Sequence, residues 1–331
     1  RSLAMSALHD VGSHPSLSTH APCTGDLQGA LVIAFFLLTL RIMMTTALSR
    51  LFGLYIQRRG PQPGLKANAA EEAALRCWYM IVHVVMSAAG LLLCMPRDWL
   101  TGSGGEIFYR LPWPHGPADD AVLSFYLLQA AINLESCVYL GLNFLRAGVR
   151  GQLMMVLHHM ITVSLIVLSW TTGVYEVGAV MMLLHDASDI GIDMLKLFGA
   201  LAWDAALVPA FILTLLLWSS LRLVYFPVHI IWPGWVKLYR GCHPALLELA
   251  PYPQTLETCI VLTEFPTSTS MLLLLHLLLA LHLAWTVQLV NKGWQKLRGG
   301  EKSSMAQFPD ACAPGLVSLP DADKLNKTKR Q

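Results

Sequence analysis

The chain has 331 residues, of which 55% are hydrophobic and only 13% are charged, and its mean hydropathy is +0.52. Soluble domains carry about 25% charged residues, so this composition excludes an ordinary soluble domain and predicts an integral membrane protein. The formal net charge is only +2, and we expect no nucleic-acid partner. The seven cysteines form no CxxC pair, so neither a zinc site nor a disulfide framework is indicated.

Apolar runs of about 20 residues, the length that a bilayer core requires, recur along the chain. We expect residues 1–26 to be disordered and lumenal, 27–50 to form the first transmembrane helix, and 296–331 to form a disordered cytosolic tail. Six further spans are predicted near residues 78–95, 121–145, 153–170, 177–198, 205–225 and 272–290. The predicted fold class is therefore an all-α membrane bundle of about seven helices.

Ionisable residues interrupt several of these spans. Arg41 lies in the first, where it either pairs within the bundle or extends toward the interface, and Glu135 lies in the third, where a structural bond to a neighbouring helix and a substrate contact stay open. His276 and His282 of the last span are six residues apart, on different faces, and are interpreted mainly as polar residues that pack in the bundle.

The most informative stretch runs from His158 to Lys196. It begins with the pair His158-His159 and ends with a run that contains His185, Asp186, Ser188, Asp189, Asp193 and Lys196. An apolar segment broken near Thr172-Gly173 joins the two clusters, as expected for two antiparallel helices. Ionisable groups within a membrane mark a functional site by default.

The helical register sharpens this expectation. His185, Asp189 and Asp193 follow one another at intervals of four residues and share one stripe of their helix. If the hairpin turns near Val174, His159 lies level with Asp189, and a carboxylate there would set the basicity of the imidazole. Lys196 is three residues beyond Asp193, within reach to pair with it.

The pattern His158-His159, then His185-Asp186-x-Ser188-Asp189, then an acid and Lys196, resembles the Lag1 motif of the ceramide synthases. The segment Leu221-Arg222-Leu-Val-Tyr225-Phe226-Pro227 also resembles that family. The resemblance covers roughly residues 70–295 and implies the TRAM–LAG1–CLN8 (TLC) membrane domain. Two departures concern the basic-acidic pair usual before the double histidine, which is missing at 146–150, and Asp193, where the family usually has Glu.

The resemblance implies a sphingoid base N-acyltransferase that makes ceramide or dihydroceramide from a fatty acyl-CoA and a long-chain base. Such a reaction needs a base for the amine proton or a nucleophile for the acyl group, and histidine can serve as either. We expect His158, His159, His185, Asp186 and Asp189 to be catalytic, with His159 as the Asp-supported base and His158 facing the thioester carbon. Glu135, Asp193, Lys196 and Arg222 are the candidate substrate-binding residues; Arg146, Arg150 and Arg222 are candidate phosphate partners.

No metal and no cofactor other than the co-substrate acyl-CoA are expected, and the partners are acyl-CoA, sphingoid base and the lipid bilayer, with a homo- or hetero-dimer left open. The resemblance also implies that residues 254–270 tune the choice of acyl chain. Two other classes compete with this hypothesis. A diiron lipid hydroxylase or desaturase needs repeated H-x3-H and H-x2-HH boxes, which the sequence lacks, and a TLC protein that senses or organises lipids would need no catalytic histidines.

The distribution of lysine and arginine predicts the orientation in the membrane. With seven spans, one side carries twelve basic residues: Arg50, Arg58, Arg59, Lys66, Arg76, Arg146, Arg150, Lys196, Lys292, Lys296, Arg298 and Lys302. The other side carries five: Arg1, Arg97, Arg110, Lys237 and Arg240. The positive-inside rule then predicts a lumenal N-terminus and a cytosolic C-terminus. The final Lys327-Thr-Lys329-Arg-Gln331 fits a KxKxx retrieval signal, so we expect the endoplasmic reticulum membrane.

A glycosylation acceptor sequence added to the C-terminus should therefore remain unmodified in cells, because glycan transfer takes place in the lumen. The measurement is the shift in gel mobility on glycosidase treatment. A glycosylated C-terminal tag would show that the predicted orientation is wrong.

Overall fold

The computed structural model describes residues 24–60, 62, 65–97, 99–100, 120–147, 153–236 and 265–297. The expected disordered ends before residue 24 and after 297 lie outside these ranges, as does most of the segment 254–270. All regular structure in the described part is helical. Two short 3₁₀ helices, η1 (Thr24–Gln28) and η2 (Met95–Arg97), accompany the long helices. The long helices are α1 (Gly29–Arg59), α2 (Ala69–Cys94), α4 (Asp120–Ala147), α5 (Leu153–Thr171), α6 (Tyr175–Ala200), α7 (Asp204–Trp218), which continues as the π-helix η3 (Ser219–Ile231), and α11 (Phe265–Leu297).

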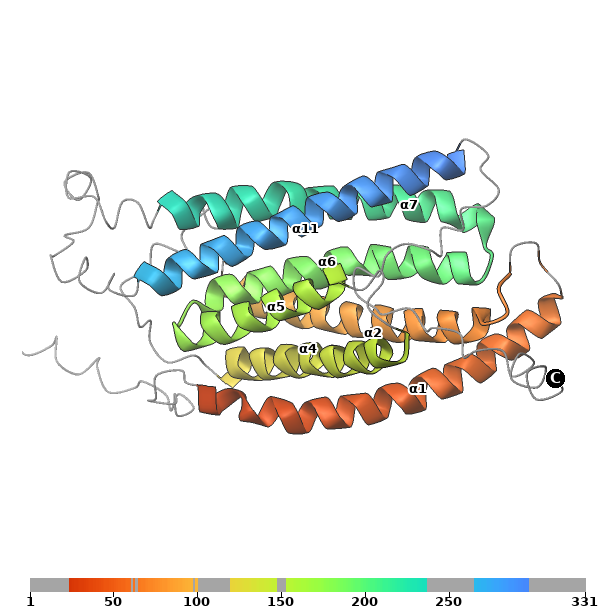
Figure 1. The fold of residues 1–331 in the computed structure, drawn as a ribbon, viewed down its shortest axis with the longest axis horizontal. Helices are drawn as coiled ribbons and strands as arrows, with labels where there is room; N and C mark the ends of the chain where they lie inside the picture. Colours follow the sequence, from red (N-terminus) through yellow and green to blue (C-terminus); the bar gives the residue numbers. More distant parts are fainter. Residues whose placement is uncertain are drawn as a thin grey trace, which may run out of the picture.

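These helices run along one common direction and form a bundle (Figure 1). Helix α1 lies at one edge and α7 and α11 lie at the opposite edge, with α2, α4, α5 and α6 between them. In the described part, the C-terminal ends of α1, α6 and α11 lie at the same end of the bundle, as the predicted alternation of spans requires. The all-α membrane bundle expected from the sequence is thus confirmed.

Helix α6 is the centre of the bundle. Eighteen of its 26 residues are buried, whereas only three of the 31 residues of α1 are. It packs against α2, α4, α5, α7 and η3. Six helical segments in the described part are long and apolar enough to cross a membrane, and α6 is not among them because of its ionisable residues. Its position explains how these charges are tolerated, since its neighbours shield it from lipid.

The α5–α6 hairpin has the backbone that its sequence favours, whereas the α6–α7 turn places Ala202 at a φ of +50°. Gly173, where the hairpin turns, has a φ of +74°, a conformation that glycine adopts without steric cost. The turn falls where the break at Thr172-Gly173 predicted it. At the other end of α6, the Arg59 guanidinium donates to the carbonyl of Leu201 over 2.8 Å, which satisfies a free carbonyl at the end of the helix.

Close helix contact and buried polar groups hold the bundle together. A Cβ atom on Gly191 of α6 would lie 3.0 Å from the backbone of Thr214 on α7, and the Thr214 hydroxyl donates to the Gly191 carbonyl over 2.8 Å. Helices in lipid associate through such close packing and interhelical hydrogen bonds, because lipid tails give no hydrophobic drive between them.

Helix α1 is held by one buried cation. Its outer side chains, such as Leu31 and Phe35, are 65% and 69% exposed, as expected for residues that face lipid, but Arg41 is only 1% exposed. Arg41 donates to Glu135 of α4 over 2.7 Å, bonds the Tyr79 hydroxyl of α2 and stacks over the Tyr139 ring at 3.6 Å. From the sequence, Arg41 could either pair within the bundle or extend toward the interface. In the structure it pairs within the bundle. Helix α1 also extends to Arg59, nine residues beyond the expected 27–50.

Replacement of Arg41 with methionine should lower the free energy of unfolding by about 3–5 kcal/mol, because it leaves the Glu135 carboxylate buried without its cation. The double variant Arg41→Met/Glu135→Leu should recover most of this loss, since no uncompensated charge remains. Thermal unfolding of the purified proteins in detergent measures both. A single variant as stable as the parent would contradict the role given to this ion pair.

Candidate functional site

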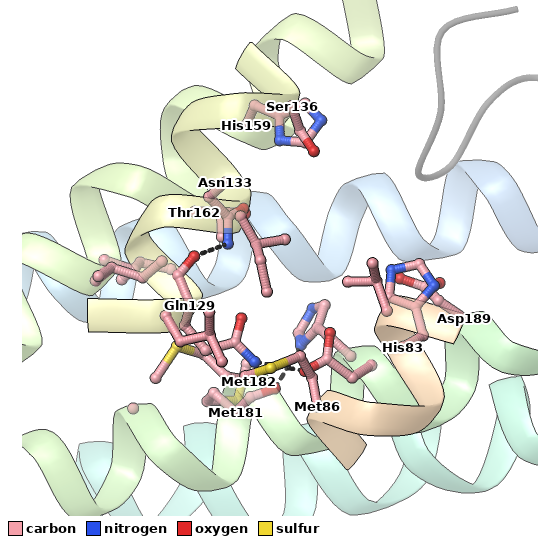
Figure 2. A pocket seen from close by; sticks show the side chains of 18 of the residues that line it. His83, Met86, Gln129, Asn133, Ser136, His159, Thr162, Met181, Met182 and Asp189 are labelled. Atoms are coloured by element: carbon pink, nitrogen blue, oxygen red, sulfur yellow. Dashed lines mark hydrogen bonds between the residues drawn. The ribbon is translucent and has the colours of Figure 1, made fainter. Parts of the chain in front are cut away.

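A cavity of about 300 Å³ lies inside the bundle, between α1, α2, α4, α5, α6 and α11. Along α6 its wall extends from Val177 to Asp189, a distance of roughly 18 Å at 1.5 Å per residue. The wall near the α5–α6 turn is mainly apolar, with Leu165, Ile166 and Leu275, whereas the opposite part is polar. The polar wall comprises His83, Glu135, His158, His159, Asp186 and Asp189. Figure 2 shows His159 and Ser136 on one side of this space and His83 and Asp189 on another.

The two adjacent histidines of α5 lack partners for their nitrogen atoms. His158 and His159 are 7% and 6% exposed, yet His158 Nδ1 and both nitrogens of His159 have no hydrogen-bond partner. The His158 ring lies edge-on to the rings of His159 at 5.5 Å and Trp285 at 5.3 Å, and its centroid is 6.3 Å from that of His185. Because successive helical residues point about 100° apart, the two side chains leave α5 in different directions, although both residues line the cavity.

The carboxylates of α6, by contrast, are bonded to other helices. Asp186 accepts a hydrogen bond of 2.5 Å from the Gln129 amide of α4. Asp189 forms an ion pair of 2.5 Å with Arg222 of η3. The same guanidinium donates through Nε to the Ser188 hydroxyl over 2.6 Å and through a terminal nitrogen to the His185 carbonyl over 3.1 Å. Arg222 is fully buried and bonds three groups within about one turn of α6, at His185, Ser188 and Asp189.

The π-helical geometry of η3 aims Arg222 at α6. Its buried residues Arg222, Phe226 and Ile230 recur every fourth residue, so they form one face that points into the bundle. Arg222 also stacks on the Trp218 ring, with its Cζ atom 4.2 Å from the ring centroid. A π-helix is rare and is frequently found at functional sites.

The direct support of His159 by Asp189 that the hairpin register predicted is absent. Both residues line the cavity, but His159 has no hydrogen bond and Asp189 pairs with Arg222. The histidine–carboxylate pair that does form joins His83 of α2 to Asp193 of α6 over 2.7 Å. His83 was not among the site residues predicted from the sequence. Its signal is an ionisable residue inside an apolar span, the same criterion that singled out the α5–α6 hairpin.

The interpretation of His282 as a packing residue is incomplete. Its Nε2 atom lies 3.1 Å from His185 Nε2, so it belongs to the histidine cluster. His276 does not, because its Nδ1 atom lies 2.7 Å from the Leu272 carbonyl of its own helix and its Nε2 atom faces Trp235.

The candidate substrate-binding residues have different surroundings. Glu135 lines the cavity and is held by Arg41, so the structural bond left open by the sequence exists. Asp193 Oδ2 lies 2.7 Å from His83 Nδ1. Lys196, the partner that the sequence predicts for Asp193, is fully buried in α6, and that pairing stays a prediction. Arg222 faces the interior of the bundle and pairs with a carboxylate. The side chain of Arg146, and Arg150 altogether, lie outside the described residues.

In the part of the chain that the structure describes, no three His, Cys, Asp or Glu side chains converge in a way that could hold a metal ion.

Comparison with known proteins identifies relatives of this chain. The family described as TLC domain matches residues 72–291. Ceramide synthase hyl-2 of Caenorhabditis elegans is 30% identical over 264 residues, which cover 80% of this chain and 74% of that protein. Ceramide synthase LOH2 of Arabidopsis thaliana is 24% identical over 76% of this chain and 81% of that protein. A shorter match, 35% identical over 130 residues, is to Ceramide synthase 1 LOH3 of the same plant and covers 39% of this chain and 38% of that protein.

Replacement of Arg222 with lysine should lower the free energy of unfolding by about 3 kcal/mol, because one ammonium cannot replace the fork that bonds Asp189, Ser188 and the His185 carbonyl together. Thermal unfolding in detergent measures the loss. The exposed Arg58→Lys is the matched control and should unfold as the parent does. Equal stability of the Arg222→Lys variant and the control would show that the guanidinium does not hold this site.

Proposed function

Because the chain belongs to the TLC-domain family, which includes the ceramide synthases, we propose that it is a sphingoid base N-acyltransferase. It would transfer the acyl group of a fatty acyl-CoA to the amine of a long-chain base and release ceramide or dihydroceramide and free CoA. The acyl-CoA is a co-substrate, and the proposal includes no resident metal or cofactor.

One observation carries this proposal: two adjacent, buried histidines that line an elongated cavity have ring nitrogens without hydrogen-bond partners. A buried polar atom without a partner costs about 1–3 kcal/mol, so a stable fold keeps such atoms where they serve a purpose. A substrate amine or a thioester in the cavity would supply the missing partner. The apolar wall, with Leu165, Ile166 and Leu275, has the shape and polarity that a long alkyl chain needs.

The chemistry of amide formation fits these groups. The amine nitrogen attacks the thioester carbon, the carbon–sulfur bond breaks, and the amine proton must leave while the CoA thiolate takes one up. His159 has both nitrogens free of protein partners and is proposed as the base that accepts the amine proton. His158 is proposed to face the thioester carbon, either as the group that polarises it or as a nucleophile that holds the acyl group transiently.

The carboxylates are proposed to attract the substrate ammonium and to stabilise the protonated form of the histidines. Asp186 lines the cavity and accepts a hydrogen bond from the Gln129 amide, so it is placed to attract the ammonium form of the sphingoid base. Asp189 lines the same wall and is anchored by Arg222, so its negative charge is fixed beside the histidines and favours the imidazolium that forms when a base accepts a proton. His185 adds the third imidazole.

The remaining candidate residues are proposed to shape the site. Glu135 holds α4 to Arg41, Asp193 holds α6 to His83, and Arg222 organises the Asp189 region. Lys196 lies within α6 toward the end where α1, α6 and α11 finish. If that end faces the cytosol, as the basic residues predict, CoA would approach from there. We propose an endoplasmic reticulum location, with a lumenal N-terminus and a cytosolic C-terminus.

Replacement of His158 or His159 with alanine should abolish N-acyl product while leaving the protein folded, because neither ring is bonded to a carboxylate whose burial would become uncompensated. The measurement is mass spectrometry of lipid products from purified protein given a fatty acyl-CoA and sphinganine. Each variant should elute as a monodisperse particle and unfold within a few degrees of the parent. His229→Ala, a histidine stacked on Tyr225 away from the cavity, is the control and should retain activity.

Incubation with acyl-CoA alone then asks whether a histidine gains the acyl mass. Modification of His158 in the parent would identify the nucleophilic route, and its absence would leave general base catalysis by His159. Two well-folded alanine variants with full turnover would rule out the proposed roles of this pair.

A further inference from the structure

A second histidine pair lies beside the first, with the His185 ring centroid 6.3 Å from that of His158. His185 of α6 and His282 of α11 face each other through their Nε2 atoms at 3.1 Å, with ring centroids 5.0 Å apart. His185 Nδ1 lies 2.8 Å from the Met181 carbonyl. His282 is fully buried, and its Nδ1 atom has no hydrogen-bond partner.

These contacts determine where the protons lie. A carbonyl oxygen only accepts, so His185 Nδ1 must carry a proton and donate it to Met181. A neutral imidazole then has a lone pair on its other nitrogen, so His185 Nε2 accepts and His282 Nε2 must donate. His282 Nδ1 consequently bears a lone pair, in agreement with its position among groups that do not bond it. The Met181 carbonyl therefore sets the tautomer of His185, and the donor on α11 bonds the remaining lone pair and holds the ring orientation.

The surroundings of His282 keep this donor in place. The rings of Trp218, Phe226 and Trp285 enclose it, with centroids 5.8, 5.6 and 6.3 Å from its own. The Thr286 hydroxyl donates to the His282 carbonyl over 2.7 Å and accepts from Trp218 Nε1 over 2.9 Å. The imidazole thus sits in an aromatic cage tied to α7, with little freedom to turn away from His185.

We propose that His282 is a positioning residue for acyl transfer, which holds His185 in the neutral form and in the orientation that it presents to His158. The centroids of the His185 and His158 rings are 6.3 Å apart, so rotation of the His185 ring would change the surroundings of the His158 imidazole. His282 acts through His185 and touches no reacting atom. This inference rests on the proposed acyltransferase function and assigns a further residue to the same site.

A purely packing role for His282 makes a different prediction. Packing requires volume, which leucine supplies, whereas positioning requires a donor at the Nε2 place, which the side-chain amide of glutamine supplies. The two substitutions His282→Leu and His282→Gln therefore separate the roles. His276→Gln, on the same helix but outside the cluster, is the matched control.

The test measures kcat and KM for N-acylation of sphinganine by the full chain in lipid nanodiscs, together with thermal unfolding. His282→Leu should lower kcat roughly tenfold, the effect of one lost hydrogen bond, with KM within about twofold of the parent's and unchanged folding. His282→Gln should recover most of the loss, and His276→Gln should behave as the parent. A folded His282→Leu variant with parental kcat, or a His282→Gln variant as slow as His282→Leu, would overturn the proposal.

A second measurement does not depend on turnover. In the parent protein labelled with ¹⁵N-histidine, the hydrogen bond between the two Nε2 atoms should give a nitrogen–nitrogen coupling that disappears in His282→Leu. Absence of that coupling in the parent would overturn the proposal, including in the case where His282→Leu fails to fold. If the parent shows the coupling but forms no N-acyl product, the proposed function fails and the positioning role for acyl transfer falls with it, while the hydrogen bond stands.

Discussion

The structure depends on one constraint: the carboxylates of α6 must be kept from lipid and supplied with partners. Asp186, Asp189 and Asp193 lie on a helix whose buried side is larger than its exposed one, and each is bonded to a different element, to Gln129 of α4, Arg222 of η3 and His83 of α2. An ionised carboxylate in hydrocarbon is expensive, so these three partners determine which helices surround α6. The outer helices, α1 above all, can then present apolar side chains to the bilayer.

The same constraint shapes the site. Because the carboxylates are engaged by a guanidinium, an amide and a histidine of other helices, the α5 histidines are left without hydrogen bonds although they are buried. Under the proposed function, a bound substrate would supply the missing partners, beside carboxylates that favour proton uptake by the histidines. Preorganised charges of this kind need no rearrangement at the moment of reaction. Arg222 connects the buried carboxylates to the histidine cluster, because its guanidinium pairs with Asp189 and also donates to the His185 carbonyl.

Much of this arrangement could be predicted from the sequence, because apolar length and the spacing of ionisable residues are local properties. The helical class, the hairpin turn at Gly173 and the convergence of His158, His159, His185, Asp186 and Asp189 on one cavity followed from them. The partners could not be predicted, because they come from distant helices. Level positions in a hairpin do not reveal that Arg222, 33 residues beyond Asp189, takes the carboxylate instead of His159. Nor does a lone histidine in an apolar span reveal whether it meets a carboxylate, as His83 does, or another imidazole, as His282 does.

The proposed reaction transfers a fatty acyl group from CoA to an amine bound in the cavity. The most direct measurement gives the purified parent protein sphinganine with a series of acyl-CoAs of increasing chain length and follows products by mass spectrometry over time. We expect an N-acyl product that accumulates with stoichiometric release of free CoA and depends on both substrates, with one range of chain lengths preferred. Folded protein that binds these lipids but forms no amide with any acyl-CoA would contradict it and would favour a TLC-domain protein that senses or organises lipids.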